Sequence, residues 1–421
     1  MSSMAARQED RQAISVVGSD SAMFASHGEA KPYRAAFFVG FAGWTLDAFD
    51  FFLVVFLLTT IGREFHQPDS VVALSLAATL VCRPLGGFVF GLLADRYGRK
   101  LPLILNLGLY AVVQILTARS RTFFAFLISR AIFGTVMGGQ WGVGTSFAME
   151  TVPLRVRGVL SGVLQQGYAL GYLLAGLAYS LGNDKVSWRT LFAVTALPAV
   201  ITALFLALGV RESSVWKRSA QQSWTQLAKS LLSNWKLLAF LTCFMMTMHM
   251  ASHGTQDMYP TFLERQWDFG SWQKTSITTV AMIGALIGGI VTGFLSDRCG
   301  RRRSIICALV IAVLIVPLWA FAPSVPLLFL GAFLLQFCVQ GAWGVVPAYG
   351  SELSPDSVRA FIPGFANQCG VVLASSVVYF EARAAHSISY AYAMAISAVA
   401  VFSLAVAVTA LGWNRELKSS L

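Results

Sequence analysis

The stretch GLLADRYGRK, at residues 91–100, has a second copy in GFLSDRCGRR, at residues 293–302. The two copies lie 202 positions apart. A further pair of segments keeps the same offset: QWGVGTSFAMETVPLRVRG at 140–158 and AWGVVPAYGSELSPDSVRA at 342–360. Because one offset relates distant segments with no net insertion, the sequence predicts two structurally similar halves that follow each other in the chain.

The composition predicts a membrane protein built from helices. The chain has 421 residues, of which 56% are hydrophobic and only 12% charged, whereas soluble domains carry about 25% charged residues. Its mean hydropathy is +0.65. Apolar runs of about 20 residues are long enough to cross a hydrocarbon core, and they lack the alternation of barrel strands. The predicted spans are 36–62, 70–94, 101–118, 122–149, 158–182, 189–210, 237–263, 273–295, 304–322, 325–350, 360–380 and 388–412.

The cationic residues predict the orientation. Net charge is +11. With the N-terminus placed inside, 21 of the 31 Lys and Arg residues fall in cytoplasmic segments and eight in external ones, while Arg83 and Arg130 lie within spans. This asymmetry follows the positive-inside rule and predicts that both termini are cytoplasmic. It also accounts for the basic character without a nucleic-acid partner.

Several sequence features that are absent limit the class of protein. The first 34 residues contain no apolar stretch typical of a cleaved signal peptide. The six cysteines have no C-x-x-C spacing, so neither a metal site nor a disulfide is expected. No phosphate loop, nucleophile elbow or H-E-x-x-H occurs, so we expect neither an enzyme nor a cofactor. The lack of an N-x-S/T sequon favours a bacterial inner membrane.

The repeat and the polar stretches predict the domain organisation. Each half carries six spans, and a polar segment with several basic residues separates the halves. The expected parts are a cytoplasmic tail at 1–34, a first half at 35–210, a cytoplasmic linker at 211–236, a second half at 237–412 and a tail at 413–421.

The repeated stretch resembles the signature of the major facilitator superfamily, G-x-L-a-D-r-x-G-r-k in the loop after the second helix. The first copy matches it almost fully, and the second has Cys299 at the aromatic position. The resemblance covers nearly the whole chain. It implies an all-α membrane protein with 12 transmembrane helices in two pseudo-symmetric halves, and a substrate site near the midplane between them.

The same resemblance implies a gate on the cytoplasmic side, in which Asp95 and its neighbours pair with helix ends and basic residues. The spacing of Glu150 with Arg157, and of Glu352 with Arg359, adds them as gate partners of the Asp95 and Asp297 loops. The alternative is a basic loop that only sets topology. The predicted gate residues are Gly91, Asp95, Arg96, Gly98, Arg99, Glu150, Arg157, Asp297, Arg298, Arg301, Glu352 and Arg359.

Two aspartates interrupt an apolar span, GWTLDAFDFFLVVF at 43–56. Asp47 and Asp50 lie one turn apart on one helix face. A charge at the bilayer centre costs about 2.5–3.5 kcal/mol, so such residues usually pair or line a pathway. Two nearby carboxylates repel, and one can hold a proton near neutral pH. We therefore predict a proton-coupling pair that faces a water-filled cavity; the alternative is a structural pair satisfied by neighbouring helices or a buried arginine.

A second polar cluster lies in MHMASHGTQDMYPTF, at 248–262. The offset maps Asp47 onto His249 and Asp50 onto Ser252, so the two clusters occupy corresponding places in the halves. Histidine changes charge near physiological pH, although a lone histidine is usually a satisfied core residue. The residues that share one broad helix face here are His249, Ser252, His253, Gln256 and Asp257.

Residues 249–261 resemble the signature of the fungal Jen-type lactate permeases, N-x-x-S/T-H-x-S/T-Q-D-x-x-x-T, except that His249 replaces the Asn. The likeness indicates the sialate/carboxylate:proton symporter branch, and it implies that His253 and Asp257 handle substrate and proton. The run D-A-F-D at 47–50 also looks like the D-G-x-D motif of aromatic-acid:proton symporters.

Two arginines lie within spans. Arg83 offers a permanently charged fork for a carboxylate, and the Jen-like resemblance implies such a contact. The alternative is a salt bridge to Asp47, Asp50 or Asp257. Arg130 matches the superfamily pattern R-x-x-x-G, and proton relay and structural pairing both stay open for it.

Amide side chains complete the predicted substrate site. The offset maps Gln165 and Gln166 onto Asn367 and Gln368, which suggests cavity lining, although hydrogen bonds between helices are the alternative. The residues predicted to contact substrate are Arg83, His249, Ser252, Gln256, Gln140, Gln165, Gln166, Tyr168, Asn367 and Gln368, and those predicted to couple protons are Asp47, Asp50, His253, Asp257 and Arg130.

Together these features predict a monomeric proton-coupled symporter that imports a small monocarboxylate, of the lactate or pyruvate type, by alternating access. Its expected partners are a small organic anion, a proton and the lipid bilayer. The alternatives are an aromatic-acid or sialic-acid proton symporter and, more remotely, a transporter-like nutrient receptor.

Overall fold

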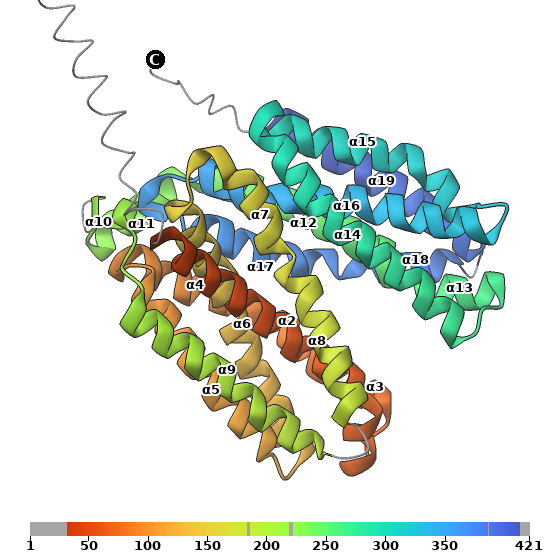
Figure 1. The fold of residues 1–421 in the computed structure, drawn as a ribbon, viewed down its shortest axis with the longest axis horizontal. Coiled ribbons are helices and arrows are strands. Elements are labelled where there is room, and N and C mark those ends of the chain that lie inside the picture. Colours follow the sequence, from red (N-terminus) through yellow and green to blue (C-terminus); the bar gives the residue numbers. More distant parts are fainter. Residues whose placement is uncertain (1–31, 183–185, 219–221, 386, 413–421) are drawn as a thin grey trace, which may run out of the picture.

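The fold is described from a computed structural model, which covers residues 32–182, 186–218, 222–385 and 387–412 (Figure 1). These residues form helices joined by short connections, with no strand among them. The predicted tails fall outside the described residues, except for the last three residues of the first one, where α2 already begins. The predicted all-α class is thus confirmed for the described part of the chain.

Each half contains six membrane-length helices or helix pairs. The first half consists of α2 (Pro32–Glu64), α3 (Asp69–Val72), α4 (Leu74–Tyr97), α5 (Lys100–Ala118), α6 (Phe123–Thr151), η1 (Leu154–Val156), α7 (Arg157–Gln165), α8 (Gly167–Gly182) and α9 (Trp188–Gly209). The short helices α10 (Ser214–Arg218) and α11 (Trp224–Ser233) follow. The second half consists of α12 (Trp235–Gln256), α13 (Tyr259–Trp267), α14 (Ser271–Cys299), α15 (Arg301–Ala320), α16 (Val325–Leu353), η2 (Asp356–Val358), α17 (Phe361–Ala374), α18 (Ser376–Ala385) and α19 (Tyr390–Leu411).

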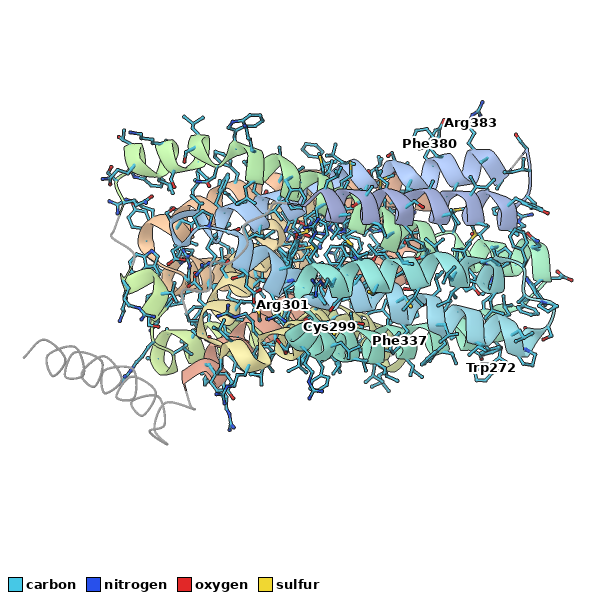
Figure 2. The ribbon with its side chains drawn as sticks, turned by 90° about the horizontal axis from the view of Figure 1, so that it is seen from above. Trp272, Cys299, Arg301, Phe337, Phe380 and Arg383 are labelled. Carbon is cyan, nitrogen blue, oxygen red and sulfur yellow. The ribbon has the colours of Figure 1, made fainter. Side chains whose placement is uncertain are left out.

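Eleven stretches of the described chain are long and apolar enough to cross a membrane. The twelfth predicted span, 158–182, is divided between α7 and α8 at Gln166. The outer surface is correspondingly apolar: Figure 2 shows Trp272 and Phe380 projecting from the bundle, and their exposed fractions are 81% and 65%. Such a surface suits lipid rather than water.

Glycines allow the main helices of each half to approach closely. A Cβ on Gly86 of α4 would lie 1.7 Å from the carbonyl oxygen of Thr135 on α6. A Cβ on Gly288 of α14 would lie 2.0 Å from that of Phe337 on α16. Both pairs of positions differ by 202, so the sequence repeat corresponds to repeated helix packing.

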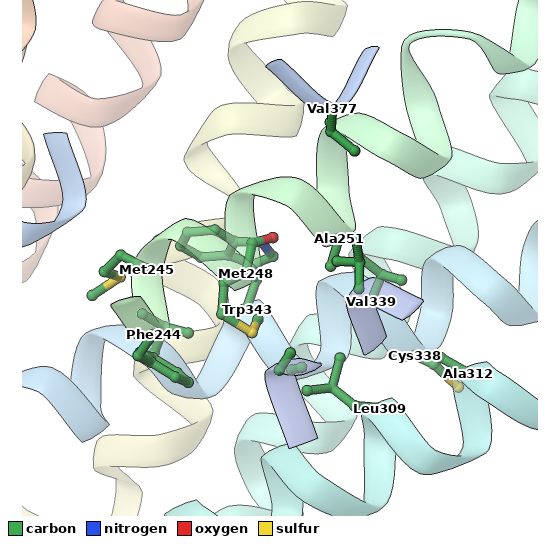
Figure 3. Packing of buried hydrophobic residues seen from close by; sticks show 14 of the residues in the cluster. Phe244, Met245, Met248, Ala251, Leu309, Ala312, Cys338, Val339, Trp343 and Val377 are labelled. Carbon is green, nitrogen blue, oxygen red and sulfur yellow. The ribbon is translucent and has the colours of Figure 1, made fainter. Parts of the chain in front are cut away.

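The two halves converge at one end, near α7 and α10, and diverge towards α3 and α13 (Figure 1). In the second half, one apolar stripe of α12 packs into the core around Trp343 of α16 (Figure 3). The stripe contains Phe244, Met248 and Ala251, which recur at helical spacing and are at most 1% exposed. Burying this stripe turns the polar face of α12 towards the other half.

Candidate functional site

A cavity of about 140 Å³ lies between the halves. Its walls come from α2, α4, α6, α7, α8, α12, α16 and α17, so both halves contribute. The predicted site residues that line it are Arg83, Gln165, Tyr168, His249, Ser252, His253, Gln256, Asp257 and Asn367.

Arg83 is held in the cavity wall by a chain of hydrogen bonds that crosses between the halves. Its Nε donates to Oε1 of Gln368 on α17 at 2.8 Å, and Nε2 of Gln368 donates to the carbonyl oxygen of Gly138 at 3.1 Å. Gln368 is completely buried. It therefore positions the guanidinium rather than lining the cavity, and it leaves the Nη groups of Arg83 without a bond from Gln368.

The polar face of α12 forms the opposite wall. Nε2 of His249 lies 3.0 Å from Oδ1 of Asn367, and Nδ1 of His253 lies 3.0 Å from Oδ2 of Asp257. Nε2 of Gln340 donates to the Ser252 hydroxyl at 3.1 Å. The side chains of His253 and Asp257 are 27% and 44% exposed, so water in the cavity can reach this pair.

Aromatic side chains make up much of the wall, and apart from Tyr168 they were missed in the sequence prediction. Trp141 and Trp343 both line the cavity, as do Trp44 and Phe52. The indole N–H of Trp343 donates to the carbonyl oxygen of Met248 at 3.1 Å, which fixes the ring. The 202 offset relates the two tryptophans, so the repeat contained the signal that could have identified them.

The prediction that Asp47 and Asp50 face the cavity is wrong. Their exposed fractions are 1% and 0%, and neither lines the cavity. Asp50 forms an ion pair with Arg130 inside the first half, and Arg130 also lies over the Phe133 ring, 4.2 Å from its centroid. The packing of α2 against α6 creates this pair, which matches the structural alternative.

Asp47 differs from Asp50. Its Oδ2 atom is buried and has no hydrogen-bond partner among the described residues. The carboxyl group is close enough to Arg83 for their charges to interact. Among the described residues no ion pair joins the two, so Asp47 is a buried carboxyl group near the arginine in the cavity wall.

Two amides predicted to contact substrate lie elsewhere. Gln140 is 1% exposed, and its side chain fills the space above Gly43 of α2. The amide of Gln166 lies against Gly289 of α14. Neither lines the cavity, and Gln368 supports Arg83 instead. Helix packing has enclosed these amides at glycine positions, so their predicted substrate contact is wrong.

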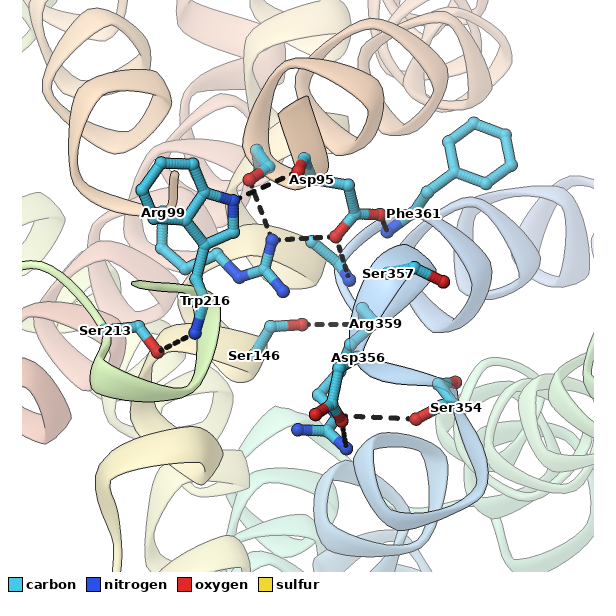
Figure 4. A network of polar contacts seen from close by, with 12 residues as sticks. Asp95, Arg99, Ser146, Ser213, Trp216, Ser354, Asp356, Ser357, Arg359 and Phe361 are labelled. Atoms are coloured by element: carbon cyan, nitrogen blue, oxygen red, sulfur yellow. Dashed lines mark hydrogen bonds and ion pairs between the residues drawn. The ribbon is translucent and has the colours of Figure 1, made fainter. Parts of the chain in front are cut away.

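At the converging end, an aspartate from each half caps a helix of the other half. Figure 4 shows the first of these, Asp95 beside Phe361. Asp95 accepts hydrogen bonds from the backbone N–H groups of Ala360 and Phe361 at 3.0 and 2.9 Å, where α17 begins. A carboxylate is favourable at a helix N-terminus because unpaired N–H groups point towards it. We call this arrangement the first aspartate clamp.

The second aspartate clamp is its symmetry-related copy. Asp297 accepts from the N–H groups of Gly158 and Val159 at 2.8 and 3.1 Å, where α7 begins. The two pairs of capped positions again differ by 202. Each aspartate also accepts from an arginine four residues later, Arg99 or Arg301, at 2.7 Å.

Each of these arginines is held by a glutamate, so Glu150 and Glu352 contact the Asp95 and Asp297 loops as the sequence predicts. Arg99 pairs with Glu150 at 2.7 Å, and Arg301 pairs with Glu352 at 3.0 Å. Burial by itself would lower the pKa of Arg99, but the carboxylates of Glu150 and Asp95 raise it above its ordinary value.

The other predicted gate residues take varied places. Arg157 pairs with Glu352 across the halves at 3.7 Å, and Arg359 pairs with Asp356 of its own half. Gly91 packs on Phe361, and Gly98 has a φ of +100°, which a side chain would strain. Arg96 and Arg298 lie over aromatic rings of their own helices and make no ion pair with another described residue.

Comparison with known proteins gives concordant findings. The Major Facilitator Superfamily profile matches residues 37–272, and the profile of the Sugar (and other) transporter family matches 236–414. A carboxylic acid transporter protein homolog of Saccharomyces cerevisiae is 28% identical over 91% of this chain and 69% of its own length. A probable 4-methylmuconolactone transporter of Cupriavidus pinatubonensis is 30% identical over 91% of both chains. The solved proton:xylose symporter XylE superimposes with a TM-score of 0.72, covering 90% of this chain and 95% of that one, at 18% identity, which shows a shared fold.

Proposed function

The chain belongs to the major facilitator superfamily, and on that premise we propose that it is a proton-coupled symporter that imports a small monocarboxylate by alternating access. The observation that carries the proposal is the placement of Arg83. A permanently charged guanidinium lies in the wall of a cavity between the halves, next to aromatic side chains. The protein is a transporter rather than an enzyme, and a transported anion would bind in this cavity.

The cavity favours a substrate with one carboxylate. Among the described residues that line it, Arg83 is the one Arg or Lys. A guanidinium binds a carboxylate through two parallel N–H···O bonds. The curated relatives named as carboxylic acid and methylmuconolactone transporters support a small organic acid.

Proton coupling is assigned to groups on both sides of the cavity. The exposed pair of His253 and Asp257 takes up a proton from cavity water. On the other side, the substrate carboxylate binds Arg83, whose side chain hydrogen-bonds Gln368 and lies near the buried Asp47. One anion and one proton then cross together, so no net charge is moved through the bilayer.

The two aspartate clamps supply the gate. They close the end predicted to be cytoplasmic while the opposite ends of the halves are apart, a state in which substrate and proton enter from outside. Occupancy of the cavity then favours the rocking of the halves that opens the clamps.

A second candidate is an aromatic-acid symporter. The walls formed by Trp44, Trp141, Tyr168 and Trp343 favour a planar apolar group beside the carboxylate. An aromatic-acid symporter would use the same mechanism, and only the acid bound next to Arg83 would differ.

Uptake into proteoliposomes tests the proposal. We expect radiolabelled lactate, pyruvate or benzoate to accumulate when an inward proton gradient is imposed, and the preferred acid to identify the substrate class. Arg83→Gln should weaken apparent affinity about 10- to 100-fold, because charge-assisted hydrogen bonds contribute about 1.5–3 kcal/mol. Arg121→Gln, the same change at an exposed position, is the matched control.

Three outcomes would contradict the proposal. Uptake that ignores the gradient would indicate facilitated diffusion. Transport of none of the three acids, by protein that transports a neutral solute, would reject an anionic substrate. Equal uptake by the Arg83 variant and the control would remove Arg83 from the site.

A further inference from the structure

Glu381 on α18 is a buried acid that the site described above does not use. Its exposed fraction is 2%, whereas Phe380 beside it is 65% exposed. Figure 2 shows Phe380 and Arg383 on the outside of the bundle, so Glu381 points to the inner side of the same helix. Neither of its carboxyl oxygens has a hydrogen-bond partner among the described residues.

A glycine makes room for this carboxyl group. A Cβ on Gly254 of α12 would lie 2.8 Å from Oε1 of Glu381. Gly254 directly follows His253, and Asp257 lies three residues further along the chain. The acid is therefore packed against the helix that carries the exposed His253–Asp257 pair of the cavity wall.

The groups around Glu381 do not offset a negative charge. Asp257, which directly follows the end of α12, places a further negative group near it. On α19, Ser397 lies beside the carboxyl group but makes no hydrogen bond of normal geometry with it. Arg383, on the same helix as Glu381, points outward.

A carboxylate enclosed in a membrane protein without a counter-ion or hydrogen bonds is strongly unfavourable, and the usual response is to bind a proton. The nearby negative charge of Asp257 also favours the protonated form of Glu381. In the conformation with closed clamps, the neutral acid is thus the form that fits these surroundings.

We infer that Glu381 is the internal site that holds the coupled proton while the aspartate clamps are closed. The proton passes from cavity water to the Asp257 carboxylate and then to the Glu381 carboxylate, so each proton taken up converts one buried carboxylate into a carboxylic acid. The inference rests on the proposed proton coupling and names the residue that stores the proton.

Glu381→Gln, which mimics the protonated acid, tests the inference, and Glu264→Gln, at a half-exposed glutamate on α13, is its matched control. In wild-type proteoliposomes, a gradient of one pH unit can drive about tenfold accumulation at one-to-one stoichiometry, since one pH unit corresponds to a factor of ten. We expect the Glu381 variant to lose this accumulation while it still exchanges labelled for unlabelled substrate without a gradient. Accumulation that survives at the wild-type level would overturn the inference.

Infrared spectroscopy provides a readout that does not depend on transport. We expect a carboxylic-acid C=O band at pH 7.5 that disappears in Glu381→Gln. Glu381→Asp, which keeps an acid, should shift the band and serves if the Gln variant does not fold. A band unchanged in the folded variants would overturn the inference.

The two readouts separate this inference from the proposed function. A Glu381 band in protein whose uptake ignores the gradient would reject proton coupling, and with it the coupling role of Glu381. Gradient-driven uptake that persists in Glu381→Gln would reject only the role of Glu381.

Discussion

At the scale of single residues, the partner of a buried charge decides what the charge can do. Asp50 and Arg130 neutralise each other within the first half, and their side chains are 0% and 1% exposed. Asp47, one turn away, faces Arg83 and has an unbonded oxygen atom. Arg83, His253 and Asp257, in contrast, line the cavity between the halves.

Arg130→Met is expected to destabilise the protein by about 3–5 kcal/mol, because it leaves the carboxyl group of Asp50 buried without its ion-pair partner. Asp50→Asn combined with Arg130→Met should recover most of that loss. Thermal unfolding of detergent-solubilised protein measures both effects, with Arg121→Met as an exposed control. If the double variant were as unstable as the sum of the single variants, the ion pair would not be the source of the effect.

At the scale of helices, glycine placement explains how the walls of the site are held. Gly86 and Gly288 bring α4 close to α6 and α14 close to α16. A break between two helices also shapes the site. Helix α12 ends next to Asp257. Pro260 lies in the first turn of α13, where a backbone N–H would have no partner within the helix, so its absence costs nothing. The polar residues of α12 thus lie in the last turns of a helix whose apolar stripe is buried.

Gly288→Val should destabilise the second half by about 1–3 kcal/mol or more, because the new side chain meets the Phe337 carbonyl oxygen and forces α14 away from α16. Gly108→Val is the matched control, since a Cβ there meets no atom within 4 Å. The midpoint of thermal unfolding in detergent compares the two. Equal midpoints would show that close approach of these helices is not needed.

At the scale of the whole molecule, the repeat produces a two-fold arrangement of contacts between the halves. Each aspartate clamp joins the end of one helix to the start of a helix in the other half. Ser146 adds a bond across the same interface, with its hydroxyl donating to the Arg359 carbonyl oxygen at 2.9 Å (Figure 4). The clamps hold the halves together at one end, which leaves the cavity between them to open at the other.

Asp95→Asn, and more strongly its combination with Asp297→Asn, should shift the protein towards a state with the clamped end open, because the uncharged amides bind the helix N-termini less well. Asp356→Asn is the control, since its side chain is 53% exposed and pairs locally with Arg359.

Electron spin resonance distances across the clamped end measure this shift. Labels on Arg155→Cys and Arg303→Cys report on the two halves once the exposed cysteines at 243, 299 and 307 have been replaced. We expect a longer-distance population in the clamp variants and not in the control. Identical distance distributions would mean that other contacts hold this end closed.

The sequence by itself determined the all-helical class, the repeat and the family, because hydrophobic length and a constant 202-residue offset are properties of the chain alone. It also identified the polar face of α12 and Arg83, since charged and polar groups in an apolar span stand out. Only the tertiary structure decided which of these groups share a cavity. Asp50 and Gln140 look as polar in sequence as His253, yet helix packing buries them against Arg130 and Gly43. Glu381 gained its surroundings from α19, the next helix, and from α12, which lies far from it in the chain, and that is why its isolation could not be read from the sequence.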